Sequence, residues 1–246
     1  MWVGQQLADG LDFWGFLGSL ILGGIILGIY TGLLGYVGAK TGLSLDLLSQ
    51  RAFGEKGSYL PSAMTSFTQI GWFGVGSFVS GGTATPNFAR FAKDGKAGAI
   101  TTVVAFFIGN SLMFFFGAVS SIFVGGNDIF EVMVRLNLFY LAVLVLGLNI
   151  WTTNDNALYT AGLGLANIFH QRKKPMVLLS GIIGTVASVW LYYNFCGWLN
   201  ILNCTLPPVG MILVLAYFMN KEDFETDQPK LKTVDWFAVA GVILGA

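Results

Sequence analysis

The chain has 246 residues, of which 54% are hydrophobic and 11% are charged, and its mean hydropathy is +0.69. Soluble globular proteins carry about 25% charged residues, so this composition excludes that class and indicates an integral membrane protein. The 13 Lys and Arg residues balance the 13 Asp and Glu residues. Without a basic excess we expect no nucleic-acid partner, and the lipid bilayer is the expected surrounding.

Apolar stretches bounded by charged residues recur along the whole chain. A helix needs about 20 mostly apolar residues to cross a bilayer. Six stretches reach or approach that length, and a two-residue turn near Trp198 separates the last two. We therefore expect an all-α, multi-pass membrane protein. The six stretches, followed by a seventh that is too short to cross, are Leu11–Ala39, Ser58–Gly82, Ala97–Val124, Leu138–Ile168, Met176–Gly197, Leu199–Met219 and Trp236–Ala246.

The loops between these stretches differ in charge, and basic loops are expected on the cytoplasmic side. Three Lys or Arg residues lie in each of the loops Thr83–Lys96, His170–Pro175 and Asn220–Val234, whereas Gly125–Asn137 contains only Arg135. From Thr83 onward the alternation is regular. The three basic loops are therefore predicted to face the cytoplasm.

The loop Lys40–Gly57 does not fit this alternation. It also has three basic residues, yet only the stretch Ser58–Gly82 separates it from the basic loop Thr83–Lys96. One crossing cannot leave two loops on the same side. Either Ser58–Gly82 is re-entrant, or the chain lacks an odd number of crossings at this point. Topology reporters fused at residues 45–55 and at residues 88–96 should place at least one of these basic loops outside the cytoplasm. If both loops report a cytoplasmic location, Ser58–Gly82 does not cross the bilayer.

A polar block, Thr152–Asn156, interrupts the stretch Leu138–Ile168 near its middle and contains Asp155, the only ionisable residue there. A charge in hydrocarbon costs roughly 2.5–3.5 kcal/mol on insertion scales, so Asp155 is expected to face protein or a water-filled cavity. The neighbouring amides and hydroxyls would line the same feature. The block therefore indicates a transport path or a binding site.

A second interruption is the run Ser77–Pro86, which is polar, rich in glycine and ended by proline. Such a run suits a broken helix, whose unwound backbone faces a binding site. An ordinary helix end followed by a loop explains the same composition. The sequence leaves both interpretations open.

Several residues near these interruptions have the chemistry of a site for a flat polar ring. Gln69 and Trp72 share a helix face because they are three residues apart, and Phe78 precedes the possible break. Aromatic faces stack on a ring, and the amides of Gln69 and Asn154 match its mixed donor and acceptor edge. Hydroxyl and carbonyl oxygens suit a sodium ion. The polar face that would supply them consists of Asn149, Thr152, Thr153 and Asn156.

Four longer motifs carry a resemblance to a known family. The segments Leu27–Leu43, Gln69–Gly76, Ile108–Phe114 and Leu146–Tyr159 closely resemble the cytosine-transporting branch of the nucleobase:cation symporter family. The resemblance extends in order over nearly the whole chain. It implies a leucine-transporter-type fold of twelve helices in an inverted repeat, of which about six to seven remain here.

The resemblance also implies residue roles. Trp72 and Phe78 would sandwich a pyrimidine such as cytosine, whose edge would be hydrogen-bonded by Gln69, Ser80 and Asn154. A sodium ion would be held by the backbone carbonyl of Asn149 and the hydroxyls of Thr152 and Thr153, and a proton remains the alternative coupling ion. The implied function is import across the inner (plasma) membrane, with no other cofactor and no enzymatic activity.

The chain departs from the family pattern near residues 76 and 77. There the segment resembling family helix 3 runs directly into the segment resembling helix 6, so that three of four crossings are missing, the odd number that the loop charges require. Met1-Trp2 resembles family helix 1 after its break, and the last family helices are absent as well. We therefore expect residues 1–246 to form a single membrane transporter domain with an internal deletion and both ends truncated.

Rival interpretations remain. A symporter for hydroxymethylpyrimidine or hydantoin would use the same sandwich. A membrane prenyltransferase holds magnesium diphosphate with Asn-Asp-x-x-Asp, which Asn154-Asp155 begins, but Leu158 occupies the position of the second aspartate. A non-transporting remnant of a permease would have the same sequence features. The deletion makes this last alternative a serious one.

Overall fold

The computed structural model describes residues 11–75, 83–125, 129–226, 229 and 231–245, and the regular secondary structure of these residues is helical. The chain divides into two compact units. The first comprises Met1–Ile29 and Thr101–Thr152, and the second comprises Tyr30–Ile100 and Thr153–Ala246. Among the described helices, α2, α6 and α9 each contribute residues to both units.

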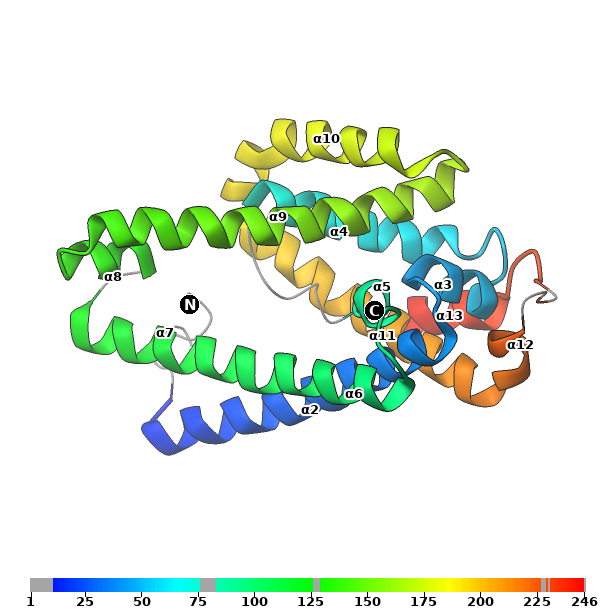
Figure 1. The fold of residues 1–246 in the computed structure, drawn as a ribbon, viewed down its shortest axis with the longest axis horizontal. Coiled ribbons are helices and arrows are strands. Elements are labelled where there is room, and N and C mark those ends of the chain that lie inside the picture. Colours follow the sequence, from blue (N-terminus) through cyan, green and yellow to red (C-terminus); the bar gives the residue numbers. More distant parts are fainter. Residues whose placement is uncertain (1–10, 76–82, 126–128, 227–228, 230, 246) are drawn as a thin grey trace. The chain divides into compact units, whose positions relative to one another are not determined.

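The helices follow the apolar stretches closely (Figure 1). The prediction of an all-α membrane protein is confirmed, because four helices in the described part of the chain have the length and hydropathy of a membrane span: Phe13–Thr41, Gly95–Val124, Lys173–Leu191 and Gly197–Met219. In chain order the helices are α2 (Phe13–Thr41), α3 (Leu45–Phe53), α4 (Tyr59–Val75), α5 (Pro86–Ala89), α6 (Gly95–Val103), the π-helix η2 (Val104–Gly109), α7 (Asn110–Val124), α8 (Ile129–Arg135), α9 (Phe139–Phe169), α10 (Lys173–Tyr193), α11 (Phe195–Met219), α12 (Lys221–Glu225) and α13 (Trp236–Gly245).

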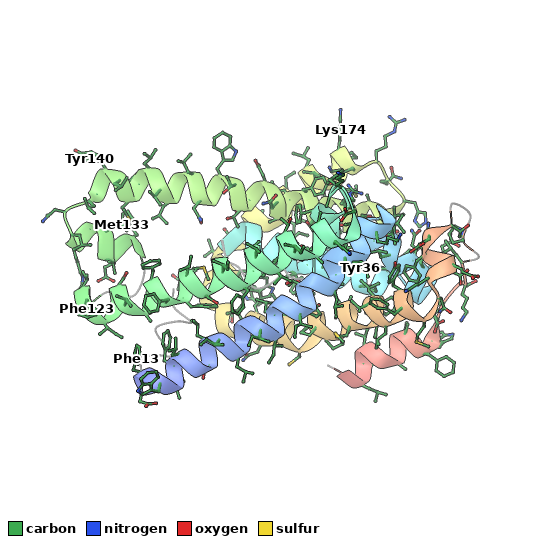
Figure 2. All side chains as sticks on the ribbon, turned by 60° about the horizontal axis from the view of Figure 1, so that its bottom comes forward. Phe13, Tyr36, Phe123, Met133, Tyr140 and Lys174 are labelled. Carbon is green, nitrogen blue, oxygen red and sulfur yellow. The ribbon has the colours of Figure 1, made fainter. Side chains whose placement is uncertain are left out.

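The first unit exposes large apolar side chains along its helices. Phe13, Phe123 and Tyr140 are 62%, 83% and 88% exposed and project outward in Figure 2. In water such a surface would drive association, but in a bilayer it is the surface that contacts acyl chains. The exposure is therefore the expected property of helices that face lipid.

The second unit has a buried core where α3 packs against the C-terminal half of α2 and against α11. α3 is amphipathic, and its N-cap Ser44 accepts a hydrogen bond from the backbone N–H of Leu47. Helix α13 covers the same core. The fully buried side chains there include Leu34, Leu45, Leu48, Phe53, Val209, Leu213, Tyr217 and Phe224.

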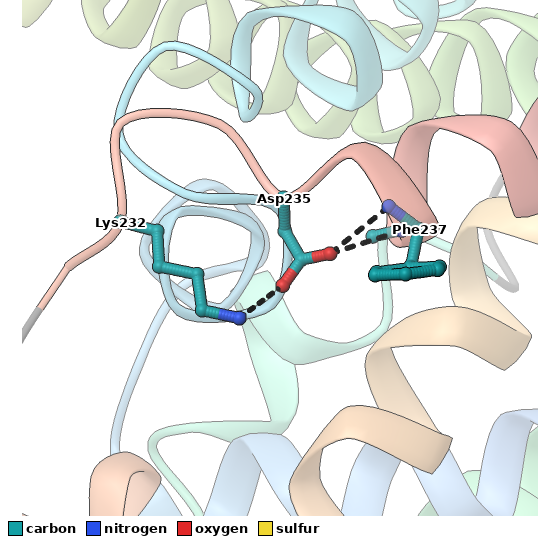
Figure 3. A network of polar contacts seen from close by, with 4 residues as sticks. Lys232, Asp235 and Phe237 are labelled. Atoms are coloured by element: carbon teal, nitrogen blue, oxygen red, sulfur yellow. Dashed lines mark hydrogen bonds and ion pairs between the residues drawn. The ribbon is translucent and has the colours of Figure 1, made fainter.

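Asp235 fixes the start of α13 (Figure 3). Its Oδ1 accepts hydrogen bonds from the backbone N–H groups of Phe237 and Ala238 at 3.1 and 3.3 Å, and its Oδ2 accepts from Nζ of Lys232 at 2.8 Å. The bond from Lys232 is the main reason why the pKa of Asp235 lies below its ordinary value. The carboxylate thus satisfies helix-end N–H groups that otherwise lack partners.

One sequence prediction about a loop is wrong. The break between the fifth and sixth stretches lies at Asn194, where α10 ends and α11 begins, whereas Trp198 lies inside α11 and is buried. Asn194 leaves the helical region with φ −110° and ψ 21°, and its side-chain Nδ2 donates to the carbonyl of Trp190 at 2.9 Å. The polar asparagine side chain therefore supports the helix end, whereas the more apolar Trp198 lies one turn into α11, where its side chain is buried.

The two basic loops around Ser58–Gly82 lie at the same end of the second unit. Asn87 Oδ1 accepts a hydrogen bond from the backbone N–H of Leu45 at 2.8 Å, and both residues are buried. Pro86 lies so close to Gly38 that a Cβ on that glycine would approach its backbone to 2.7 Å. α4 starts at this end, and the chain is back there at Asn87. These contacts favour the re-entrant alternative over a single crossing.

We expect both loops to be labelled from the cytoplasm. Lys56→Cys and Lys93→Cys, both at exposed positions, should react with an impermeant maleimide in inside-out vesicles and not in intact cells. Asn137→Cys, in the loop with few basic residues, serves as the control that reacts in intact cells. Labelling of Lys56→Cys and Lys93→Cys from opposite sides would show that Ser58–Gly82 crosses the bilayer.

Asp46 on α3 is a buried carboxyl outside the spans. Burial raises its pKa to about 6, against the opposing effects of the 2.6 Å hydrogen bond from Ser62 and the positive charge of Arg90. The folded state therefore holds this proton more tightly than the unfolded state. The contribution of Asp46 to stability is complete below the unfolded pKa of 3.8 and is lost as the pH rises through about 6.

Asp46→Asn should remove this dependence. The amide oxygen still accepts from Ser62 but never ionises, so the thermal midpoint in detergent should stay level across this pH range and exceed that of the parent protein at pH 7. The exposed Asp223→Asn is the matched control and should retain the pH slope. An unchanged slope in Asp46→Asn would assign the dependence to another group.

Candidate functional site

The candidate site residues of the second unit lie on two helices in contact, α4 and α9. Ser62 of α4 bonds to Asn167 of α9, and Ser66 donates to the carbonyl of Ala161 at 3.2 Å. As the numbering rises along α4 it falls along α9, so the two helices run antiparallel. Beyond these contacts, the continuation of α4 carries Gln69 and the continuation of α9 carries Asn154.

Gln69 is buried within α4, with 7% of its surface exposed. A glutamine is rarely buried without a reason, because its amide loses hydrogen bonds to water. Trp72 lies one turn further along the same helix, while its indole lies outside the described residues. The helix thus places Gln69 in the interior of the second unit, and its hydrogen bond to a substrate stays a prediction.

Asn154 has a buried acceptor atom. Its Oδ1 is shielded from solvent and accepts no hydrogen bond from the part of the chain that the structure describes. An unpaired buried amide oxygen costs about 1–3 kcal/mol, so most such groups have partners. Asn154 Oδ1 is therefore available to a donor from a ligand.

The proposed cation ligands follow one another on a single turn of α9. The hydroxyl of Thr152 donates to the backbone carbonyls of Leu148 and Asn149, each at 3.1 Å. Its hydrogen thus points along the helix, and its oxygen lone pairs stay available. Asn149 and Thr152 are exposed, whereas Thr153 is half-buried.

Two further expectations about the site stay predictions, each for its own reason. Phe78 and Ser80 lie outside the described residues, so their placement beside Gln69 stays a prediction. Asp155 is exposed, so the described residues do not enclose it, and the expectation that it faces a water-filled cavity stays a prediction. On a helix, Asp155 points about 100° away from Asn154, whose Oδ1 is buried.

Sequence reasoning missed Asn167. This residue lies next to the end of α9, where a polar residue looks like a simple helix terminus, but its amide bonds to residues of α3 and α4. The available signal was its i, i+3 spacing from Gly164, which places the two residues side by side on the helix. Serines occupy the corresponding face of α4.

Comparison with known proteins gives one consistent result. A family model described as permease for cytosine/purines, uracil, thiamine, allantoin matches residues 1–84 and 74–229. The cytosine permease of Escherichia coli (strain K12) is 36% identical over 336 aligned positions, which cover 100% of this chain and 80% of the relative. The allantoin permease of Bacillus subtilis (strain 168) is 34% identical over 82 residues, which cover 33% of this chain and 16% of that protein.

The alignment also reveals missing sequence. The alignment spans 336 positions of the Escherichia coli relative, whereas this chain has 246 residues. At least 90 positions of that relative therefore have no counterpart here. The two stretches that match the family model overlap at residues 74–84, a range that includes the predicted junction. The match nevertheless extends over most of the chain. This membrane protein therefore belongs to the family of permeases for cytosine and purines, uracil, thiamine and allantoin.

Proposed function

We propose that this chain carries cytosine, or a closely related nucleobase, inward across the plasma membrane together with a cation. The family membership supports transport of a flat heterocycle, and the cytosine permease of Escherichia coli is the relative that aligns over the whole chain. The observation that carries the proposal is Oδ1 of Asn154, which is buried and has no hydrogen-bond partner among the residues that the structure describes.

The chemistry of Asn154 suits cytosine. The exocyclic amino group of cytosine is a hydrogen-bond donor, and Oδ1 of Asn154 is a buried acceptor. The amide of Gln69 offers a donor and an acceptor to the rest of the ring edge. In the proposal Trp72 and Phe78 stack on the two faces of the ring, and Ser80 adds a hydroxyl at its edge. Hydroxymethylpyrimidine and hydantoin have similar edges and are the alternative substrates.

The coupling ion in this proposal is sodium. Asn149 would contribute its backbone carbonyl, and Thr152 and Thr153 their hydroxyls. Neutral oxygen ligands suit a hard cation. The Thr152 hydroxyl donates its hydrogen to the carbonyls of Leu148 and Asn149, so its oxygen can still act as a ligand. A proton is the alternative coupling ion. Binding measurements in sodium and potassium, repeated across pH, distinguish the two.

A second candidate is a membrane protein that binds its substrate without transporting it. The at least 90 positions absent relative to the Escherichia coli permease favour this candidate, and we place the junction between residues 76 and 77. Alternating access requires two repeats that move against each other around the site. A chain without several of these helices can retain a binding face and still lack a transport cycle.

The direct test is equilibrium binding of radiolabelled cytosine to the purified chain. Trp72→Ala should weaken binding by about 10–100-fold, because it removes a stacking face worth roughly 1–3 kcal/mol. Trp190→Ala is the matched control, since Trp190 is 61% exposed on α10 and should not affect affinity. Equal affinity in the parent chain and Trp72→Ala would reject the assigned pocket.

A further inference from the structure

Asn167 joins three parts of the second unit through its side-chain amide. Its Nδ2 donates to Ser62 Oγ on α4 at 2.9 Å and to Ser58 Oγ just before α4 at 3.1 Å. Its Oδ1 accepts from Gln50 Nε2 on α3 at 2.5 Å. Both ends of one amide are therefore engaged by elements that are far apart in sequence.

The direction of these hydrogen bonds is fixed by their other partners. Ser62 donates its hydroxyl hydrogen to Asp46 Oδ1 at 2.6 Å, and Ser58 donates its own to the carbonyl of Glu55 at 2.7 Å. Each serine therefore has only lone pairs left for Asn167. An amide N–H₂ group meets this requirement and a carboxylate does not, because an ionised carboxylate only accepts.

Above Asn167 the seam between α9 and α4 is made of small residues. A Cβ on Gly164 would collide with the hydroxyl of Ser66 and would lie 2.8 Å from the carbonyl of Ser62. Ala161 and Ala157 are buried along the same face. Small residues allow the two helices to approach closely, and because lipid gives no hydrophobic drive, van der Waals packing and interhelical hydrogen bonds hold them together. The position of one helix along the other therefore depends on polar contacts as well as on this packing.

Asn154 and Gln69 lie on the rigid continuations of this pair. Asn154 belongs to α9, 13 residues before Asn167, and Gln69 belongs to α4, 7 residues after Ser62. Because a helix has a fixed rise per residue, an axial shift at the Asn167 contact moves Asn154 relative to Gln69 by the same amount. A hydrogen-bonded ring edge does not tolerate a shift of 1 Å or more.

We propose that Asn167 is a positioning residue of the substrate site, which sets the axial offset between Asn154 on α9 and Gln69 on α4. This inference rests on the proposed function, since it takes these two amides to bind the same nucleobase. Asn167 does not contact the substrate. It acts through the register of the two helices, with Ser62 and the buried Asp46 as the fixed end of the hydrogen-bond chain.

The experiment compares Asn167→Asp and Asn167→Leu with the parent chain and with Thr160→Val. Aspartate has the shape of asparagine but presents acceptors to serines that need donors. Both Asn167 variants should weaken cytosine binding by about tenfold and change the preference for cytosine over uracil. Thr160 is buried on α9 and its hydroxyl has no partner among the described residues, so Thr160→Val should change neither.

Register is measured separately by disulfide formation between Ser66→Cys and Ala161→Cys, with Cys196 and Cys204 replaced by serine. Asn167→Asp should change the rate of this cross-link, whereas Thr160→Val should not. Unchanged selectivity and an unchanged cross-linking rate in both Asn167 variants would overturn the inference. If the parent chain binds no nucleobase, the proposed function fails, and the cross-linking rate alone then decides whether Asn167 sets the register.

Discussion

Replacing Asn154 with leucine is expected to weaken cytosine binding by about 10–100-fold and at the same time to raise the thermal midpoint of the purified protein. The two effects have one cause. Oδ1 of Asn154 is buried and has no partner in the described part of the chain, so the empty protein bears the cost of desolvating it. Leucine has a similar size and removes that cost together with the acceptor that the ligand needs.

Opposite signs distinguish a binding residue from a structural one. If Asn154 supported the fold, its replacement would lower both affinity and stability. Asn200→Leu on α11 is the control, because Asn200 is exposed and is none of the proposed binding residues, and it should leave cytosine affinity unchanged. Asn154→Asp should instead alter selectivity among nucleobases, since a carboxylate accepts hydrogen bonds and no longer donates them. A lower thermal midpoint for Asn154→Leu would contradict the assignment.

The helices were predictable because their physical requirement is simple. A span must bury its backbone polar groups within itself and present apolar side chains to lipid, so charges mark its ends. The stretch Leu138–Ile168 thus became α9, Phe139–Phe169, and the stretch Leu11–Ala39 became α2, Phe13–Thr41. The break at Asn194 was misplaced, because a break between two adjacent apolar helices has no charge to mark it.

The sequence left two alternatives for Ser58–Gly82, a re-entrant stretch or the loss of an odd number of crossings. The charges of the loops indicate on which side of the membrane each loop lies, but they do not show which residues are in contact. The hydrogen bond between Leu45 and Asn87 joins residues 42 positions apart, and nothing in their sequence positions indicates that they touch. Asn167 was missed for the same reason. Its partners Gln50, Ser58 and Ser62 are more than a hundred residues away, and a sequence pattern reports only neighbours along one helix.

The sequence indicates which residue types the candidate site would use and not how they are arranged. A glutamine on α4 and a polar block on α9 follow from residue type and spacing, and their binding of one substrate stays a prediction. The orientation of the Asn154 amide depends on packing between helices, which spacing does not determine. The exposed positions of Asn149, Thr152 and Asn156 likewise depend on which parts of the fold are present to cover them.

Reinserting the missing segment is expected to raise the rate of cytosine uptake well above that of the unmodified chain. The alignment with the Escherichia coli permease leaves at least 90 of its positions without a counterpart in this chain, and the segment would be inserted at the junction that the sequence predicts between residues 76 and 77. In an inverted-repeat transporter both repeats line the substrate, and they alternate access by moving against each other. The measurement is uptake of radiolabelled cytosine by cells without a permease of their own.

The polar face of α9 gives this expectation its physical reason. Asn149, Thr152 and Asn156 are exposed near the middle of α9, a helix of 31 residues. Polar groups near the middle of a bilayer need protein or water around them in place of lipid. The reinserted helices would supply that cover. A scrambled apolar segment of equal length is the control and should restore no uptake, and Trp72→Ala in the restored chain should abolish it. Uptake by the unmodified chain at the restored level would instead show that the remaining helices complete the transport cycle without the missing ones.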